Sequence, residues 1–140
     1  MKKSSATLIG LVTAAAIAFA FAWPYASMEF ASSAYYTEQD KRQYDYYTPD
    51  LFIKMPRISS HYDFGFGRIV GTEANVFTVN FYGVTDVSRI EDYLTSEGYK
   101  RQATCDVEAQ CWKSPATKDV ITLGNLNSQK AVFVQIYRRL

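Results

Sequence analysis

Residues 76–82 read VFTVNFY and alternate apolar with polar side chains. Successive side chains of an extended strand point to opposite faces, so Phe77, Val79 and Phe81 share one face. Residues 131–137, AVFVQIY, repeat this alternation near the end of the chain. Two such segments predict strands of a sheet that buries one of its faces.

Residues 86–97 lie between these two segments and have the spacing of a helix. Val87, Ile90 and Leu94 fall at positions i, i+3 and i+7, so they form one apolar face. Gly98 follows at the position where a left-handed residue ends a helix. We therefore expect one amphipathic helix packed on the sheet, begun by Thr85 or Asp86 as a cap.

Shorter segments complete the predicted domain. The sequence Thr48-Pro49-Asp50 is typical of a helix start and predicts a short helix over residues 49–54. Further strands are expected at residues 62–66, 99–105, 111–113 and 120–123, with turns at residues 114–115 and 125–128. The predicted fold class is α+β, with one antiparallel sheet and one main helix packed on it, over residues 49–140.

Residues 24–48 form a polar connector that holds six of the eleven tyrosines. It has no clean apolar stripe, so either a helix or a spacer is compatible with it. Tyrosine buries a large area and keeps a polar tip, which favours interfaces. Tyr44, Tyr46 and Tyr47 are therefore candidates for contacts with a partner. The alternative is that these tyrosines pack on the domain or lie near a membrane.

The N-terminus has the pattern of an export segment. Two lysines follow Met1, and residues 6–23 carry no charge. At about 1.5 Å per residue, this run approaches the ~30 Å hydrocarbon core of a bilayer. The sequence Ala20-Phe21-Ala22 also suits cleavage by a signal peptidase. Residues 1–23 are thus a signal peptide or a single transmembrane anchor, and both readings stay open.

The basic N-terminus predicts the orientation of the chain. Positive charge stays in the cytoplasm, so the remainder is expected on the periplasmic side of the inner membrane. The protein would be anchored there through residues 6–23, or would be soluble in the periplasm after cleavage.

Composition excludes several classes of function. Fifteen Lys and Arg balance fourteen Asp and Glu, for a formal charge of +1, so nucleic acid is not expected as a partner. One His and two Cys are too few for an ordinary structural zinc site, and no cofactor is predicted. Ser59, His61 and Asp63 alternate along one strand, but this spacing holds them too far apart for a nucleophilic triad. No enzymatic activity is predicted.

Cys105 and Cys111 are the most specific local feature. Outside the cytoplasm two lone cysteines normally pair, so a disulfide is expected here. It would either staple a hairpin or display a rigid loop to a partner. The candidate contact residues of that loop and its flank are Asp106, Val107, Glu108, Gln110 and Trp112.

An export segment, a small α+β domain and one disulfide together resemble the layout of small exported immunity and inhibitor proteins of bacteria. The resemblance is one of plan and rests on no shared motif. It implies a periplasmic protein that binds a toxin or hydrolase. The alternative is an accessory or structural subunit of an envelope or secretion complex, assembled through the anchor and the Tyr-rich connector.

Overall fold

The structure is a computed structural model that describes residues 2–126 and 128–140. The chain divides into two compact units, Met1–Ala31 and Ser32–Leu140. The predicted turn at residues 125–128 includes residue 127, which lies outside the described residues.

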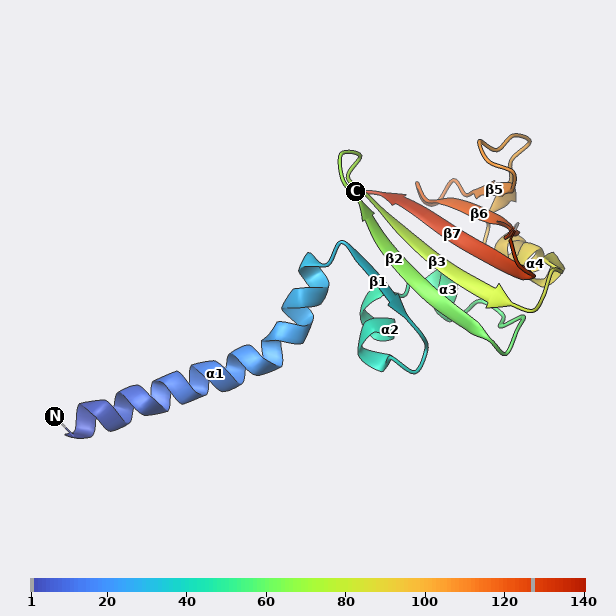
Figure 1. The fold of residues 1–140 in the computed structure, drawn as a ribbon. Helices are drawn as coiled ribbons and strands as arrows, with labels where there is room; N and C mark the ends of the chain where they lie inside the picture. The colour runs from blue at the N-terminus through green and yellow to red at the C-terminus, as the bar shows by residue number, and fades with distance from the viewer. Residues whose placement is uncertain (1, 127) are drawn as a thin grey trace. The chain divides into compact units, whose positions relative to one another are not determined.

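The first unit is the helix α1 (Lys2–Phe30), which continues beyond the uncharged run that ends at residue 23. Within its stretch Ser4–Phe30 a window of 18 residues has a mean hydropathy of 2.0, and the stretch is long and apolar enough to cross a membrane. A signal sequence has the same length and composition, so both predicted roles remain compatible with α1. Pro24 lies inside the helix, which bends in its C-terminal part (Figure 1).

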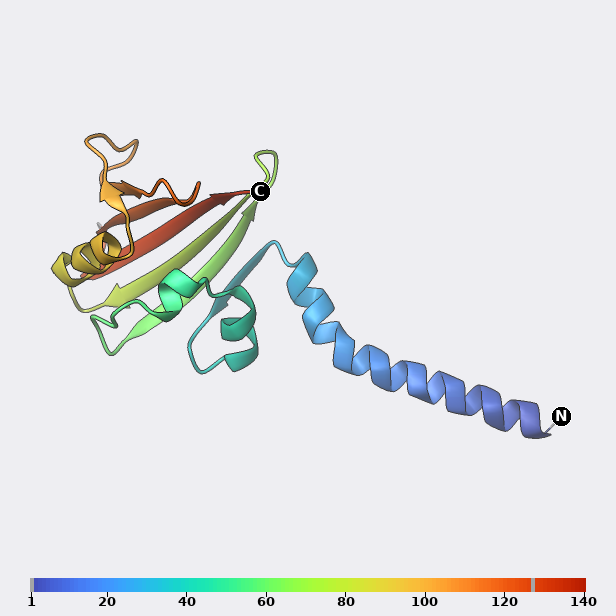
Figure 2. The ribbon, with the colours of Figure 1, turned by 180° about the vertical axis from the view of Figure 1, so that it is seen from behind.

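Within the described residues, the second unit holds one antiparallel sheet of seven strands in the order β1-β2-β3-β7-β6-β5-β4. The strands are β1 (Ser33–Tyr36), β2 (Tyr62–Ile69), β3 (Ala74–Tyr82), β4 (Lys100–Arg101), β5 (Gln110–Lys113), β6 (Val120–Asn125) and β7 (Ala131–Arg139). The helices α2 (Lys41–Tyr47), α3 (Asp50–Ile53) and α4 (Ser88–Ser96) all lie on one face of this sheet, as Figure 2 shows from behind. The α+β class with a single antiparallel sheet is confirmed.

The core lies between the sheet and these helices. Val79 of β3 pairs with Val134 of β7, and Phe77 pairs with Ile136, so the apolar faces of both strands point the same way. All four side chains are buried. The alternation that predicts the two strands therefore also sets which of their faces meets the helices.

Helix α4 covers most of the predicted helix, but it begins at Ser88, and Val87 occupies its N-cap position in place of the predicted Thr85 or Asp86. Ile90 and Leu94 are buried against the sheet. A carboxylate oxygen of Asp86 accepts hydrogen bonds from the backbone N–H and the hydroxyl of Ser88, at 2.9 and 2.7 Å. Gly98 has a φ of +91°, which is the left-handed conformation expected at this stop.

The domain begins earlier than the predicted boundary at residue 49. Residues 33–47 supply the edge strand β1 and the helix α2 instead of a connector. Tyr36 stacks on Phe64 with 5.6 Å between ring centroids, and Tyr47 stacks on Phe66 at 4.7 Å. Tyrosine rings thus cover the outer part of the sheet. The strand β1 reads SAYY and has no clean alternation of apolar and polar residues, so the sequence did not mark it as a strand.

The strand expected at residues 99–105 is shorter in the structure. Only Lys100 and Arg101 pair with β5, opposite Lys113 and Trp112. After Arg101 the chain leaves the sheet and returns at Gln110. The intervening residues form the irregular segment that carries the disulfide loop.

Candidate interaction site

Cys105 and Cys111 form a disulfide, as predicted, with their Cα atoms 5.3 Å apart. Cys111 lies on β5 opposite Thr122 of β6, whereas Cys105 belongs to the irregular segment after β4. The bond closes residues 105–111 into the disulfide loop, one end of which is part of the sheet. Figures 1 and 2 both show this segment standing out from the sheet.

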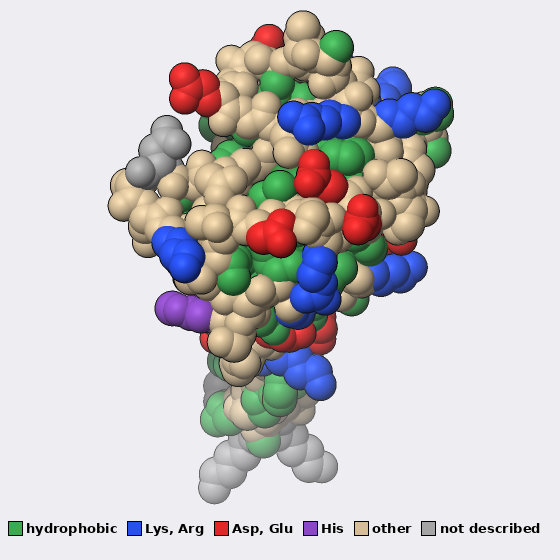
Figure 3. Space-filling model, turned by 90° about the vertical axis from the view of Figure 1, so that its right-hand side faces the viewer, with side chains coloured by type: hydrophobic (Ala, Val, Ile, Leu, Met, Phe, Trp, Pro, Cys, Tyr) green, Lys and Arg blue, Asp and Glu red, His purple; other side chains and the backbone are tan. Residues whose placement is uncertain are grey.

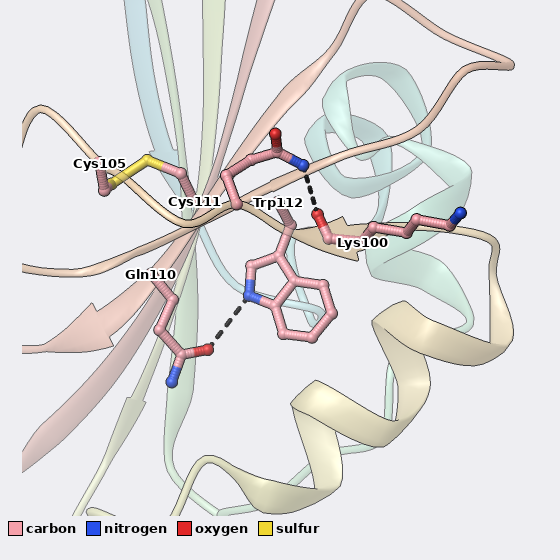
Figure 4. Close-up of a disulfide and its surroundings, with 6 residues drawn as sticks. Lys100, Cys105, Gln110, Cys111 and Trp112 are labelled. Atoms are coloured by element: carbon pink, nitrogen blue, oxygen red, sulfur yellow. Dashed lines mark hydrogen bonds between the residues drawn. A yellow bond between two sulfur atoms is a disulfide. The ribbon is translucent and has the colours of Figure 1, made fainter.

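Hydrogen bonds hold the base of the disulfide loop. The backbone N–H of Gln102 donates to the carbonyl of Cys111 at 2.7 Å. The indole N–H of Trp112 donates to the side-chain oxygen of Gln110 at 3.1 Å (Figure 4). These bonds and the disulfide join both ends of the loop to the sheet edge.

Trp112 does not lie at the surface where the prediction placed it. Only 5% of its area is exposed, because β5 turns its ring to the side that the helices cover. Its neighbour Gln110 is half-buried, and the side-chain oxygen of Gln110 accepts the indole hydrogen bond. Trp112 therefore acts as an anchor of the loop in the core and not as a contact residue.

The tip of the loop carries the other predicted contact residues. Asp106 and Glu108 are exposed, and Val107 between them exposes 57% of its area. The backbone N–H of Ala109 donates to the carbonyl of Val107 at 2.8 Å, which tightens the turn. Two carboxylates and one apolar side chain thus stand together on a short, constrained turn.

Gly124 on β6 lies against Ala109 of the disulfide loop, and it was not predicted as a site residue. A Cβ atom at this position would lie 2.9 Å from the Cβ of Ala109 and 3.1 Å from the ring of Phe133. Only glycine lets the loop approach the strand so closely. A glycine inside the strand pattern VITLGN was the available signal, because such glycines often mark close approach.

The strands β4 and β5, which flank the disulfide loop in the chain, carry basic side chains. Lys100 of β4 lies directly opposite Lys113 of β5, which is an unfavourable pairing of like charges. Arg101 is turned toward Glu91 of α4, with 3.9 Å between the charged groups. Figure 3 shows acidic and basic side chains interspersed on this side of the molecule. A partner of the loop would therefore meet both signs of charge.

The three tyrosines predicted as partner contacts differ in their surroundings. Tyr47 is buried, and the hydroxyl of Tyr44 accepts a hydrogen bond from Arg57 at 2.9 Å. Tyr46 is more exposed and packs edge-on against Tyr47. Packing on the domain thus accounts for Tyr44 and Tyr47, and only Tyr46 keeps a large accessible area.

The uncovered face of the sheet carries a shallow hollow of about 310 Å³ beside the edge strand. Tyr35 exposes 86% of its area there, and its ring lies 3.6 Å from the position of a Cβ on Gly65. Covering a strand glycine with an aromatic ring stabilises a sheet. Tyr35 therefore has a structural role in the sheet.

Ser59, His61 and Asp63 each contact Tyr82. The backbone N–H of His61 donates to the hydroxyl of Ser59 at 3.1 Å, and the His61 ring lies 5.0 Å from the ring of Tyr82. The hydroxyl of Ser59 bonds the backbone carbonyl of Tyr82. The carboxylate of Asp63 accepts hydrogen bonds from the hydroxyl of Tyr82 at 2.8 Å and the amide of Asn80 at 3.1 Å. Burial and this carboxylate raise the pKa of Tyr82 to about 12. These hydrogen bonds hold the start of β2 against the end of β3, which is a structural role.

Comparison of the chain with family models, with curated proteins and with solved structures finds no significant match. Among the described residues, no three His, Cys, Asp or Glu side chains are grouped so that they could hold a metal ion.

Proposed function

We propose that this chain is an exported interaction module of the immunity or inhibitor type, whose disulfide loop enters a cleft of a toxin or hydrolase. One arrangement carries the proposal. An acidic tip is closed by a disulfide at its base and seated on a rigid sheet. A loop that is already ordered loses little conformational entropy on binding, so more of its contact energy appears as affinity.

The N-terminal unit supports an exported location. Two lysines before an apolar helix favour insertion with the N-terminus in the cytoplasm. Disulfides persist in the periplasm and are rare in the cytosol, which agrees with the Cys105–Cys111 bond. The domain would then act on the periplasmic side, anchored through α1 or released from it.

The charges around the loop define the partner further. A cleft that receives Asp106 and Glu108 needs Lys or Arg at its floor. The same cleft needs acidic groups at its rim, where it would approach Lys100 and Lys113. Complementary charge of this kind mainly sets specificity and association rate, whereas a few buried contacts carry the affinity.

The test compares two charge-reversed proteins. The first has Asp106→Lys and Glu108→Lys in the loop. The matched control has Asp45→Lys and Asp92→Lys, which change the same number of exposed carboxylates elsewhere. Each is used as the full chain to capture proteins from envelope extracts, beside the unchanged protein. A partner of the loop is retained by the unchanged protein and by the control, but not by the loop variant.

The affinity of that partner should fall about tenfold or more with the loop variant, which equals about 1.4 kcal/mol. Inhibition of the partner's hydrolytic or toxic activity by the unchanged protein would support the inhibitor role. A loop-dependent partner that has no such activity favours the accessory subunit of an envelope complex instead. Equal retention of every protein by both variants would refute a role for the loop in binding.

A further inference from the structure

A polar pocket of about 450 Å³ opens beside α3, the residues that follow α4, and the adjoining ends of β6 and β7. None of residues 105–111 lines it, so it is distinct from the disulfide loop. The lining residues that can bind a polar ligand are Asp50, Lys54, Glu97, Tyr99, Asp119 and Arg138.

Arg138 is held in a fixed orientation at this pocket. Its Nε and Nη2 atoms donate to the carboxylate of Asp119 at 3.1 and 2.9 Å. Its guanidinium also lies over the ring of Phe77, 5.2 Å from the centroid. Asp119 is only 8% exposed, so the pair is partly shielded from water. The Nη1 group has no hydrogen-bond partner among the described residues and stays able to bind a ligand.

Tyr99 supplies a polar group that the fold leaves unpaired. Its side chain is only 9% exposed and lines the pocket. Its hydroxyl makes no hydrogen bond to any residue in the described part of the chain. Burial, with a smaller effect of the Asp119 charge, raises the pKa of Tyr99, so its hydroxyl stays protonated at neutral pH. The hydroxyl oxygen itself is accessible from the pocket, so it can bond water or a ligand that enters there.

The exposed lining residues add charges of both signs. Lys54 brings a positive charge, whereas Asp50 and Glu97 bring negative ones. Within residues 2–126 and 128–140, these three side chains take part in no ion pair. The pocket therefore combines two cations, Lys54 and Arg138, with three carboxylates, one of which is committed to Arg138.

We propose that this pocket binds a small zwitterion, namely a free α-amino acid or a short peptide with both termini unblocked. The ligand carboxylate meets the Nη1 group of Arg138 and the ammonium of Lys54. The ligand ammonium meets Glu97 and Asp50. The hydroxyl of Tyr99 donates to the bound ligand and so gains the partner that the fold does not provide.

The mixed lining selects against ligands of a single charge. A simple anion would approach Arg138 and Lys54 but would also face Glu97 and Asp50, and a simple cation would face the reverse. Unpaired or like charges in a partly desolvated site reduce affinity, so a molecule with both charges is favoured. The pocket volume lies within the ~300–1,000 Å³ range of small-molecule sites.

The test is an NMR titration of the full chain in detergent micelles. The unblocked probes are L-alanine and the dipeptide L-alanyl-L-alanine. The blocked probes are the N-acetylated dipeptide and the dipeptide amidated at its C-terminus. Unblocked probes should shift the amide signals of Gly98 and Tyr99 in a saturable way. Each blocked form should bind about tenfold more weakly, because it lacks one charge. Comparison of the amino acid with the dipeptide shows which of them the pocket prefers.

Two substitutions connect the binding to this pocket. Tyr99→Phe removes only the unpaired hydroxyl, so it should weaken the unblocked dipeptide about tenfold and leave thermal stability unchanged. Tyr137→Phe removes a hydroxyl outside the pocket and should bind as the unchanged protein does. Glu97→Gln should reduce the preference for the dipeptide over its N-acetylated form.

Three results would overturn the inference: no saturable shift with either unblocked probe, equal binding of blocked and unblocked forms, or full affinity in Tyr99→Phe. Because the pocket and the disulfide loop share no residue, each of these results leaves the test of the loop unaffected.

Discussion

Gly124→Ala should destabilise the domain by displacing the disulfide loop from the sheet. The new Cβ would lie 2.9 Å from the Cβ of Ala109, a separation that real Cβ atoms do not show, and 3.1 Å from the ring of Phe133. The methyl group of Ala109 has no rotamer through which it can move away. The backbone of the loop must therefore shift, or β6 must.

The magnitude follows from two opposing effects. Overpacking in a well-packed site costs about 1–3 kcal/mol. Replacing glycine by alanine restricts the unfolded chain and recovers roughly 0.4–1 kcal/mol. The free energy of unfolding should thus fall by about 1–2 kcal/mol, and the thermal midpoint by about 4 °C or more. Gly67→Ala is the matched control, because a Cβ there meets nothing within 4 Å.

The assay is urea unfolding of the full chain in micelles, followed by the fluorescence of Trp112 after Trp23→Phe has made it the only tryptophan. Ala109→Gly in the same protein removes one side of the close contact. The double variant should therefore recover at least about 0.5 kcal/mol relative to additivity. Unchanged stability in Gly124→Ala, or strictly additive effects, would show that the loop does not rest on this strand.

Three further predictions concern the disulfide, the pH dependence and the topology. Replacing Cys105 and Cys111 with serine should lower the free energy of unfolding by about 2 kcal/mol by the loop-entropy relation and leave a folded domain, as urea unfolding will show. A larger loss would mean that the disulfide holds more than its own loop. Burial raises the pKa of Tyr36 and of Tyr93 from 10.0 to about 12. Their stabilising effect is complete below pH 10 and should disappear toward pH 12, because the unfolded chain loses these protons first. Urea unfolding between these pH values should show the decline, and Tyr36→Phe should make it shallower. A periplasm-specific reporter fused to the C-terminus should be active, and an inactive fusion that is fully expressed would contradict export of the domain.

Much of the sheet and its main helix could be predicted because their signals are local. Phe77, Val79 and Phe81 alternate along a few residues, and burial of one sheet face follows directly from that pattern. Ile90 and Leu94 likewise define one face of α4 without reference to any other element. The edge strand β1 was missed because its residues, SAYY, lie in a polar stretch without clean apolar alternation.

The disulfide loop was predictable in part. With only two cysteines, the pairing of Cys105 with Cys111 had no alternative once export was expected. The burial of Trp112 and the role of Gly124 depend on how β5 pairs with β6. That register involves residues about ten positions apart and leaves no mark on the loop sequence itself.

The sequence by itself determined the apolar N-terminal helix and the alternating strands, because each depends on neighbouring residues. It also determined the disulfide, because the chain has only two cysteines. Only the tertiary structure decided which residues meet at the polar pocket. Arg138 reaches Asp119 because β7 pairs with β6, and Tyr99 joins them where the chain leaves α4. Contacts between distant segments are set by the packing of whole elements, so the sequence pattern around each residue does not contain them.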